Sequence, residues 1–212
     1  MKKGLFITIE GGEACGKSTQ VTKLKEYFKE KFNENEYLFV REPGGTPLAE
    51  EIRKLLLNYT EDKPLPMTEL LLFCAARCQI SNNKIIPALN EGKIVIADRF
   101  YDSTLAYQGE ARGIMNKSEL LQLTHLIIGE LKPDLTFYLK LAPEEAFKRK
   151  SKCNEALDRI ESEGLEFHQA VARGYDFVAE VEKDRFCIID AALSPDEIFD
   201  IIKKEIEERL GK

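Results

Sequence analysis

Residues 11–18 read GGEACGKS and match the pattern G-x-x-x-x-G-K-[ST] at every fixed position. The run 5–10 before them is apolar and β-branched, which is typical of a buried parallel strand. The apolar residues of the following run, 19–32, are spaced as one face of a helix. The alternative is a glycine-rich turn that binds no ligand. A full match between a strand and a helix favours a phosphate-binding loop, and therefore a nucleotide site.

The residue types of this loop indicate its chemistry. Its glycines let backbone N–H groups converge on phosphate oxygens, and the N-terminus of the following helix adds a favourable dipole. We expect Lys17 to reach the β- and γ-phosphates and the Ser18 hydroxyl to hold Mg²⁺. The residues of the loop expected to contact ATP are Gly11, Gly12, Glu13, Ala14, Cys15, Gly16, Lys17, Ser18 and Thr19.

Composition sets the broad class of the protein. At 212 residues, 43% of them hydrophobic and 32% charged, the chain suits one globular domain, 1–212. The net charge of -6 argues against a nucleic-acid partner, and no apolar run approaches the roughly 18 residues of a membrane span. No leader-like segment opens the chain, so the expected location is the cytoplasm. Five scattered cysteines and two histidines suit neither a disulfide framework nor a zinc site.

Apolar runs alternate with helical patterns along the rest of the chain. This alternation predicts an α/β fold, a five-stranded parallel sheet with helices on both faces. Loops at the carboxyl ends of such strands form the ligand crevice. The predicted strands are 5–10, 37–40, 93–98, 134–141 and 186–190, and the predicted helices are 19–32, 47–57, 67–90, 118–129, one that opens at 142–145, 165–182 and 195–210.

The helical stretch 67–90 carries a possible base-binding pair. Phe73 and Arg77 are four residues apart, so they lie one turn from each other on the same face. An aromatic ring beside a guanidinium would stack on a base and donate to its carbonyl oxygen. Spacing alone favours the alternative, a core phenylalanine beside a solvated arginine, and both interpretations stay open at this level.

Two charged segments are candidates for the phosphates. Asp98 ends a predicted strand and Arg99 follows it, which suits a magnesium shell and a phosphate contact or, alternatively, a strand-end turn with a surface ion pair. The polar segment 149–159 is weakly periodic and rich in basic residues. It predicts either a lid that closes over the triphosphate or a solvated helix end.

Taken in chain order, these motifs resemble the thymidylate kinase family, and the bacterial type in particular. The likeness rests on the acid inside the phosphate-binding loop, the Phe73-x-x-x-Arg77 helix and two longer stretches. One is REPGGT at 41–46, and the other is DRF at 98–100 running into STLAYQG at 103–109. DRIE at 158–161 followed by Phe-His at 167–168 also looks like bacterial members. The similarity runs from about residue 5 to residue 190.

The resemblance implies phosphoryl transfer from ATP to dTMP, with Mg²⁺, giving dTDP and ADP. It also implies the nucleoside monophosphate kinase core with strand order 2-3-1-4-5, a mobile lid at about 149–163 and a homodimer built through helices. Family roles carried onto this chain give the expected dTMP-binding residues as Glu13, Arg41, Pro43, Arg53, Phe73, Arg77, Arg99, Ser103, Thr104, Tyr107 and Gln108. Arg149 would pack on adenine, and Ser18 with Asp98, through water, would hold the Mg²⁺.

The source of the catalytic positive charge is where the chain departs from some relatives. Eukaryotic-type members carry an arginine inside the phosphate-binding loop, where this chain has Glu13-Ala14. Some bacterial members place a lid arginine where this chain has Asn154. We therefore expect Arg159 to be the main transition-state donor and Lys152 to assist it, beside Lys17 and Arg99 as the other catalytic residues.

Two other functions stay open on the sequence. The first is a kinase for another small acceptor, such as a different nucleoside monophosphate or a deoxynucleoside. The second is a nucleotide-binding module or switch that does little chemistry, which would need a loop ordered by the γ-phosphate. The hypothesis of a switch gives no role to four residues, Phe73, Arg77, Arg99 and Tyr107.

Overall fold

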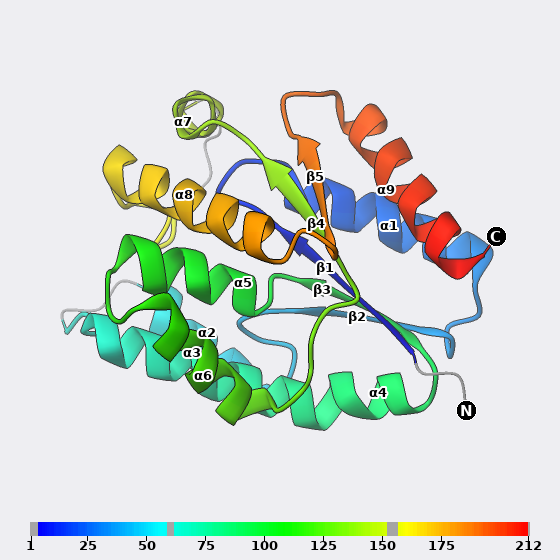
Figure 1. Ribbon diagram of the computed structural model, residues 1–212, viewed down its shortest axis with the longest axis horizontal. Helices are drawn as coiled ribbons and strands as arrows, with labels where there is room; N and C mark the ends of the chain where they lie inside the picture. The colour runs from blue at the N-terminus through cyan, green and yellow to red at the C-terminus, as the bar shows by residue number, and fades with distance from the viewer. Residues whose placement is uncertain (1–3, 59–61, 152–156, 212) are drawn as a thin grey trace.

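The computed structural model describes residues 4–58, 62–151 and 157–211, and its centre is one parallel sheet (Figure 1). The strand order is β2-β3-β1-β4-β5, and all four neighbouring pairs run parallel. The predicted fold class and the strand order implied by the resemblance are both confirmed. The strands are β1 (Leu5–Glu10), β2 (Tyr37–Arg41), β3 (Ile94–Asp98), β4 (Leu135–Lys140) and β5 (Phe186–Asp190).

Helices cover both faces of the sheet, because alternate residues of each buried strand point to opposite sides. Phe6 packs in one core and its neighbour Ile7 in the other. Helices α1 and α9 lie on the Ile7 side, and α3, α4, α5 and α6 lie on the Phe6 side (Figure 1). The helical elements are α1 (Lys17–Lys31), α2 (Pro47–Leu57), α3 (Pro66–Ile80), the π-helical η1 (Ser81–Ile85), α4 (Ile86–Asn90), α5 (Tyr101–Thr104), the π-helical η2 (Leu105–Ala111), α6 (Lys117–Ile128), α7 (Pro143–Lys150), α8 (Leu165–Val181) and α9 (Pro195–Leu210).

The helical segments differ from the sequence-based expectation at two places. The predicted helix 67–90 is helical throughout, but the π-helical turn η1 divides it into α3 and α4. Pro87 has no N–H to donate to the carbonyl four residues before it, and that carbonyl belongs to η1. The second difference is that residues 101–111, which were not predicted as helical, form α5 and η2.

The carboxyl ends of three neighbouring strands create the crevice that carries the site. In the ladder, Ile9 of β1 and Arg41 of β2 both pair with Asp98 of β3. The segments that follow these residues therefore leave the sheet at one edge, which is where open α/β folds bind ligands. No helix within the described ranges has the length and apolar character needed to cross a bilayer.

Candidate active site

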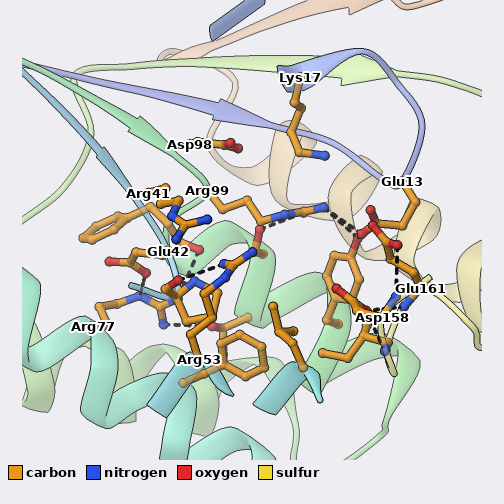
Figure 2. A pocket seen from close by; sticks show the side chains of 18 of the residues that line it. Glu13, Lys17, Arg41, Glu42, Arg53, Arg77, Asp98, Arg99, Asp158 and Glu161 are labelled. Atoms are coloured by element: carbon orange, nitrogen blue, oxygen red, sulfur yellow. Dashed lines mark hydrogen bonds and ion pairs between the residues drawn. The ribbon is translucent and has the colours of Figure 1, made fainter. Parts of the chain in front are cut away.

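A cavity of about 260 Å³ opens at this edge of the sheet (Figure 2). In the close view Arg99 lies between Lys17 on one side and Arg53 with Arg77 on the other. The cavity is therefore lined by both the phosphate-binding loop and the predicted acceptor residues. Its lining residues are Glu13, Lys17, Ser18, Arg41, Glu42, Pro43, Arg53, Leu57, Phe73, Arg77, Asp98, Arg99, Phe100, Ser103, Thr104, Tyr107, Gln108, Asp158, Ile160 and Glu161.

The loop between β1 and α1 has the backbone that a phosphate cradle needs. Gly11 (φ 147°) and Gly16 (φ 92°) adopt conformations that side chains rarely allow, and a Cβ on Gly11 would lie 2.6 Å from the Leu139 carbonyl oxygen. The Lys17 ammonium donates to the carbonyls of Gly11 (3.2 Å) and Gly12 (2.8 Å). Lys17 thus braces its own loop and keeps its charged end at the cavity.

Glu13, the acid inside the loop, lies in a cluster of charge and hydroxyl groups. It accepts from Arg99 at 2.7 Å and from the Tyr107 hydroxyl at 2.6 Å. Burial favours the neutral carboxyl, but the positive charges of Arg99 and Lys17 and the Tyr107 hydrogen bond outweigh it and lower the pKa of Glu13 to about 2. Glu13 is therefore an anion that can accept a hydrogen bond from a hydroxyl group of a ligand.

Arg99 is held in a left-handed conformation (φ 68°) directly after β3. Its guanidinium donates to the Gly11 carbonyl (2.9 Å), to Ser103 Oγ (3.3 Å) and to the Tyr175 hydroxyl (3.0 Å), and it lies over the Tyr107 ring. The alternative of a surface ion pair is wrong for Arg99, because its partners come from the interior of the site. The guanidinium is fixed from several sides at the middle of the cavity.

Glu10, a residue that the sequence analysis missed, shares the partners Ser103 and Tyr175 with Arg99. Its carboxylate is fully buried and accepts from the Phe100 N–H (2.6 Å), Ser103 Oγ (2.7 Å) and the Tyr175 hydroxyl (2.9 Å). Burial and the nearby Asp102 carboxylate raise its pKa to about 7, against the opposing effect of Arg99. The sequence did carry a signal for Glu10, because it is an acid that ends an apolar strand immediately before the glycine loop.

The acceptor end of the cavity contains the Phe73–Arg77 pair. Arg77 is only 3% exposed and donates to Glu42 (2.7 Å), Thr104 Oγ1 (2.8 Å) and the Phe100 carbonyl (3.2 Å). The alternative interpretation, in which Arg77 is a solvated side chain, is therefore wrong. Glu42, also missed by the sequence analysis, supplies the counter-charge, although burial raises the pKa of its carboxyl above the usual range.

Arg41 and Arg53 line the same end of the cavity from β2 and α2. Arg41 pairs with Glu50 at 3.0 Å, and Arg53 donates to the Pro43 carbonyl at 2.9 Å. Both guanidinium groups keep further N–H donors beyond these bonds, so an anion could bind between them. Three predicted phosphate contacts, Arg41, Arg53 and Arg99, thus come together in one cavity.

The oxygen groups of Ser18 and Asp98 line the cavity beside Lys17. A hydroxyl and a carboxylate are ligands that Mg²⁺ prefers, and this ion usually keeps waters and phosphate oxygens in its remaining positions. Among the described residues no cluster of three or more His, Cys, Asp or Glu side chains forms a complete cage for a metal. The two residues fit an Mg²⁺ that arrives together with ATP.

The predicted lid residues occupy different places. Arg149 donates to the Ala191 carbonyl (2.9 Å) and the Ala14 carbonyl (3.4 Å), which places it beside the phosphate-binding loop. Arg159, in contrast, is 6% exposed, pairs with Glu69 at 2.6 Å and does not line the cavity. This arrangement does not support Arg159 as a transition-state donor. Lys152 and Asn154 lie outside the described residues.

Asp158 and Glu161, quoted above only as part of a motif, also line the cavity. Asp158 Oδ1 accepts from the N–H groups of Ile160 (2.9 Å) and Glu161 (2.8 Å), which shapes this turn. Burial and the negative charges of Glu13 and Asp158 raise the pKa of the Glu161 carboxyl. The segment therefore brings negative charge close to the phosphate-binding loop.

Comparisons with known proteins agree on one family. A family model described as Thymidylate kinase matches residues 9–202. The thymidylate kinase of Chlorobaculum parvum is 46% identical over 202 residues, covering 92% of this chain and 91% of that protein. That of Symbiobacterium thermophilum is 44% identical over 208 residues, covering 98% and 95%. The crystal structure of thymidylate kinase from Ehrlichia chaffeensis superposes with a TM-score of 0.77 at 32% identity, over 97% of this chain and 99% of that one.

Proposed function

The chain belongs to the thymidylate kinase family, and we propose on this premise that it transfers the γ-phosphoryl group of ATP to dTMP. The products are dTDP and ADP, as a step of dTTP synthesis. The observation that carries the proposal is a single cavity that joins the lysine of a phosphate-binding loop to an aromatic–arginine pair suited to a pyrimidine. The residue roles below are part of the proposal.

The base of dTMP would lie at the acceptor end of the cavity. Phe73 would stack on thymine, while Arg77 and Thr104 would donate to its polar edge. The ion pair with Glu42 and the 2.8 Å bond between Arg77 and Thr104 support this role, because they hold both donors in place before the base arrives. Preorganised donors of this kind favour a base with a carbonyl at that edge.

The sugar and phosphate of dTMP would lie toward the loop. The Tyr107 ring would pack under the sugar and disfavour a 2′-hydroxyl, and the anionic Glu13 would accept a hydrogen bond from the 3′-hydroxyl. Arg41, Arg53 and Arg99 would bind the 5′-phosphate, with Arg99 nearest to the transferring group. Pro43, Ser103 and Gln108, which also line the cavity, would complete this subsite.

In the transfer step, an oxygen of the dTMP phosphate forms a bond to the γ-phosphorus while the bond from that phosphorus to the β,γ-bridging oxygen breaks. Negative charge spreads over the transferring oxygens, so fixed cations lower the barrier. Lys17 would act on the ATP side and Arg99 on the acceptor side. When bound by Ser18 and, through water, by Asp98, Mg²⁺ would neutralise phosphate charge.

We further propose that 149–163, of which 152–156 lie outside the described residues, serves as a lid that excludes water, since an open site would let ATP hydrolyse. Arg149, fixed between the Ala14 and Ala191 carbonyls, would pack on adenine. Lys152 as an assisting cation stays a prediction. A homodimer built through helices and a cytoplasmic location complete the proposal, and light scattering behind size-exclusion chromatography tests the dimer.

A panel of acceptors with labelled ATP tests the function. We expect dTMP to exceed dGMP and dAMP in kcat/KM by several orders of magnitude. Discrimination against dUMP will be weaker, because one methyl group in an apolar pocket is worth roughly 1–3 kcal/mol. A purine monophosphate or a deoxynucleoside as the best acceptor contradicts the proposal, and ATP binding without transfer to any acceptor indicates a binding module.

A further inference from the structure

A buried charge cluster outside the cavity surrounds Glu69, in the first turn of α3. Its carboxylate is 1% exposed and accepts from Arg159 Nη2 (2.6 Å), from Arg112 Nε and Nη2 (both 3.2 Å) and from Gln108 Nε2 (2.9 Å). Burial favours the neutral acid, but the bonds from Gln108, Arg159 and Arg112 outweigh it and lower the pKa of Glu69. One carboxylate on α3 thus binds groups from two other segments, η2 with its C-cap residue Arg112 and the turn that contains Arg159.

Arg159 also attaches its segment to α2. Its Nε donates to the Leu56 carbonyl (2.9 Å), and its backbone N–H donates to the Leu57 carbonyl (3.2 Å). A second attachment comes from Arg112, which pairs with Glu163 at 2.7 Å. The segment 157–163 is therefore fastened at two points to elements that carry the acceptor end of the cavity.

The fastened segment and the acceptor residues are close neighbours of the cluster. Asp158, Ile160 and Glu161 line the cavity on either side of Arg159. On the other side of Glu69, its partner Gln108 also lines the cavity, and Phe73 stands one helical turn farther along α3. Glu69 does not line the cavity, and its hydrogen-bond partners Gln108, Arg112 and Arg159 lie outside the phosphate-binding loop, so it can act only through these neighbours.

The energetics of buried ion pairs favour a positioning role for Glu69 over a contribution to the overall stability of the fold. A buried ion pair often stabilises a fold no better than apolar side chains of the same size, because both charges lose their hydration. Removing one partner leaves the other charged and unsolvated, which distorts whatever that partner held. In this chain the residue left behind would be Arg159, whose neighbours in the chain, Asp158 and Ile160, line the cavity.

We propose that Glu69 is a positioning residue that fixes the segment 157–163 against the acceptor end of the cavity through Arg159. On this assignment the Glu69–Arg159 pair controls acceptor binding, and Arg159 does not act on the transferring phosphoryl group. The inference rests on the proposed function, because it takes the acceptor to be dTMP. It predicts an effect on KM for the acceptor and not on kcat.

Steady-state kinetics of Glu69→Gln and Arg159→Met test the assignment. We expect KM for dTMP to rise roughly tenfold in each, as for the loss of one hydrogen bond to a charged group, with kcat at saturating dTMP and KM for ATP within about threefold of wild type. The double variant should raise KM no more than either single variant, because the two residues act as one unit. Calorimetric titration of dTMP should give the same ratio of Kd values.

Glu51→Gln is the matched control, since Glu51 is an exposed carboxylate on α2 that pairs with Lys54, and its variant should behave as wild type.

If Glu69→Gln does not fold, Arg112→Met is the second variant. It keeps the Glu69–Arg159 pair, loses the Glu163 attachment and should raise KM for dTMP by about threefold. A kcat for Arg159→Met lowered about 10²–10³-fold with KM unchanged overturns the inference in favour of a transition-state donor. Folded variants with wild-type kcat and KM also overturn it. If wild type prefers another acceptor, the proposed function fails, and the same KM comparison with that acceptor still decides the role of Glu69.

Discussion

At the scale of single residues, two carboxyl groups on either side of the Arg99 guanidinium differ in charge. Glu13 faces Arg99 and Lys17 and has a pKa of about 2, whereas Glu10 is buried next to Asp102 and has a pKa of about 7. The difference arises because nearby cations dominate at Glu13 and lost hydration dominates at Glu10. The arginine proposed to bind the acceptor phosphate thus has one fixed anion beside it and one group that titrates near neutral pH.

This contrast predicts opposite effects of pH on stability. The folded-state pKa of Glu10 is raised above its unfolded value of 4.5, so the stability that its protonation contributes is complete below pH 4.5 and is lost as the pH rises through about 7. Relative to Glu10→Gln, wild type should lose about 3 kcal/mol of unfolding free energy across this window. Urea unfolding of both proteins at several pH values measures the difference.

Glu13→Gln serves as the comparison in which the change of stability with pH has the opposite sign. Its folded-state pKa is lowered to about 2, so the stability that ionised Glu13 contributes is present above pH 4.5 and is lost as the pH falls toward 2. If the stability gap between wild type and Glu10→Gln does not change between pH 4.5 and pH 7, then the Glu10 carboxyl does not titrate in that range.

At the scale of elements, the contact between α8 and η2 sets the position of the Tyr175 hydroxyl, which donates to Glu10. Gly174 faces η2, and a Cβ there would lie 2.6 Å from Ala106 Cα and 3.0 Å from Glu110 Cβ. Both helices therefore approach more closely than any residue with a side chain would allow. This spacing brings Tyr175 within reach of Ser103 and Arg99.

Gly174→Ala should consequently destabilise the protein. Alanine favours a helix by about 1 kcal/mol over glycine, but a clash with backbone forces the two helices apart, and overpacking typically costs about 1–3 kcal/mol. We expect the lost packing to dominate and the urea midpoint to fall. Gly164→Ser is the control, because a Cβ there meets nothing within 4 Å and serine is a favoured residue at the N-cap of α8. A urea midpoint for Gly174→Ala at or above that of wild type would show that α8 and η2 can move apart without a loss of stability.

At the scale of the whole molecule, the two proposed substrate subsites share one cavity but depend on different segments. The proposed ATP subsite is formed by the loop after β1, which contributes Glu13, Lys17 and Ser18 to the cavity, and the proposed acceptor subsite includes residues of α2, α3 and α5. A ligand that binds only the folded protein stabilises it by mass action, by about 2.7 kcal/mol at a concentration of 100 times its Kd. Each substrate should therefore raise the unfolding midpoint on its own.

Lys17→Ala should separate these two effects. The Lys17 ammonium bonds mainly to carbonyls of its own loop, so its loss removes charge at the phosphates and leaves the acceptor end intact. The variant should keep the midpoint shift caused by dTMP, lose most of the shift caused by a non-hydrolysable ATP analogue with Mg²⁺, and lose nearly all turnover. Differential scanning calorimetry and kinetics provide these measurements. A variant that retains a tenth or more of wild-type kcat would contradict the role of the loop.

The sequence by itself determined the features that depend on neighbours in the chain. Hydrophobic spacing predicted every strand and most helices, and the glycine loop with Lys17 and Ser18 was predicted from residues 11–18 alone. Such features are local, because helical faces and loop conformations follow from residues within a few positions of one another. The strand order and the acceptor residues came instead from a resemblance, since apolar spacing does not say which strands pair.

Only the tertiary structure decided which charged groups meet. Glu10 and Tyr175 are 165 positions apart, and Glu69 and Arg159 are 90 apart. No pattern in the sequence links them, which is why the sequence predicts Arg159 at the phosphates. The segment 101–111, which packs on α8, likewise carries no local pattern that predicts it as helical. The physical reason is that a buried charge takes its partner from whatever the closed fold brings within about 3 Å, and not from its neighbours in the chain.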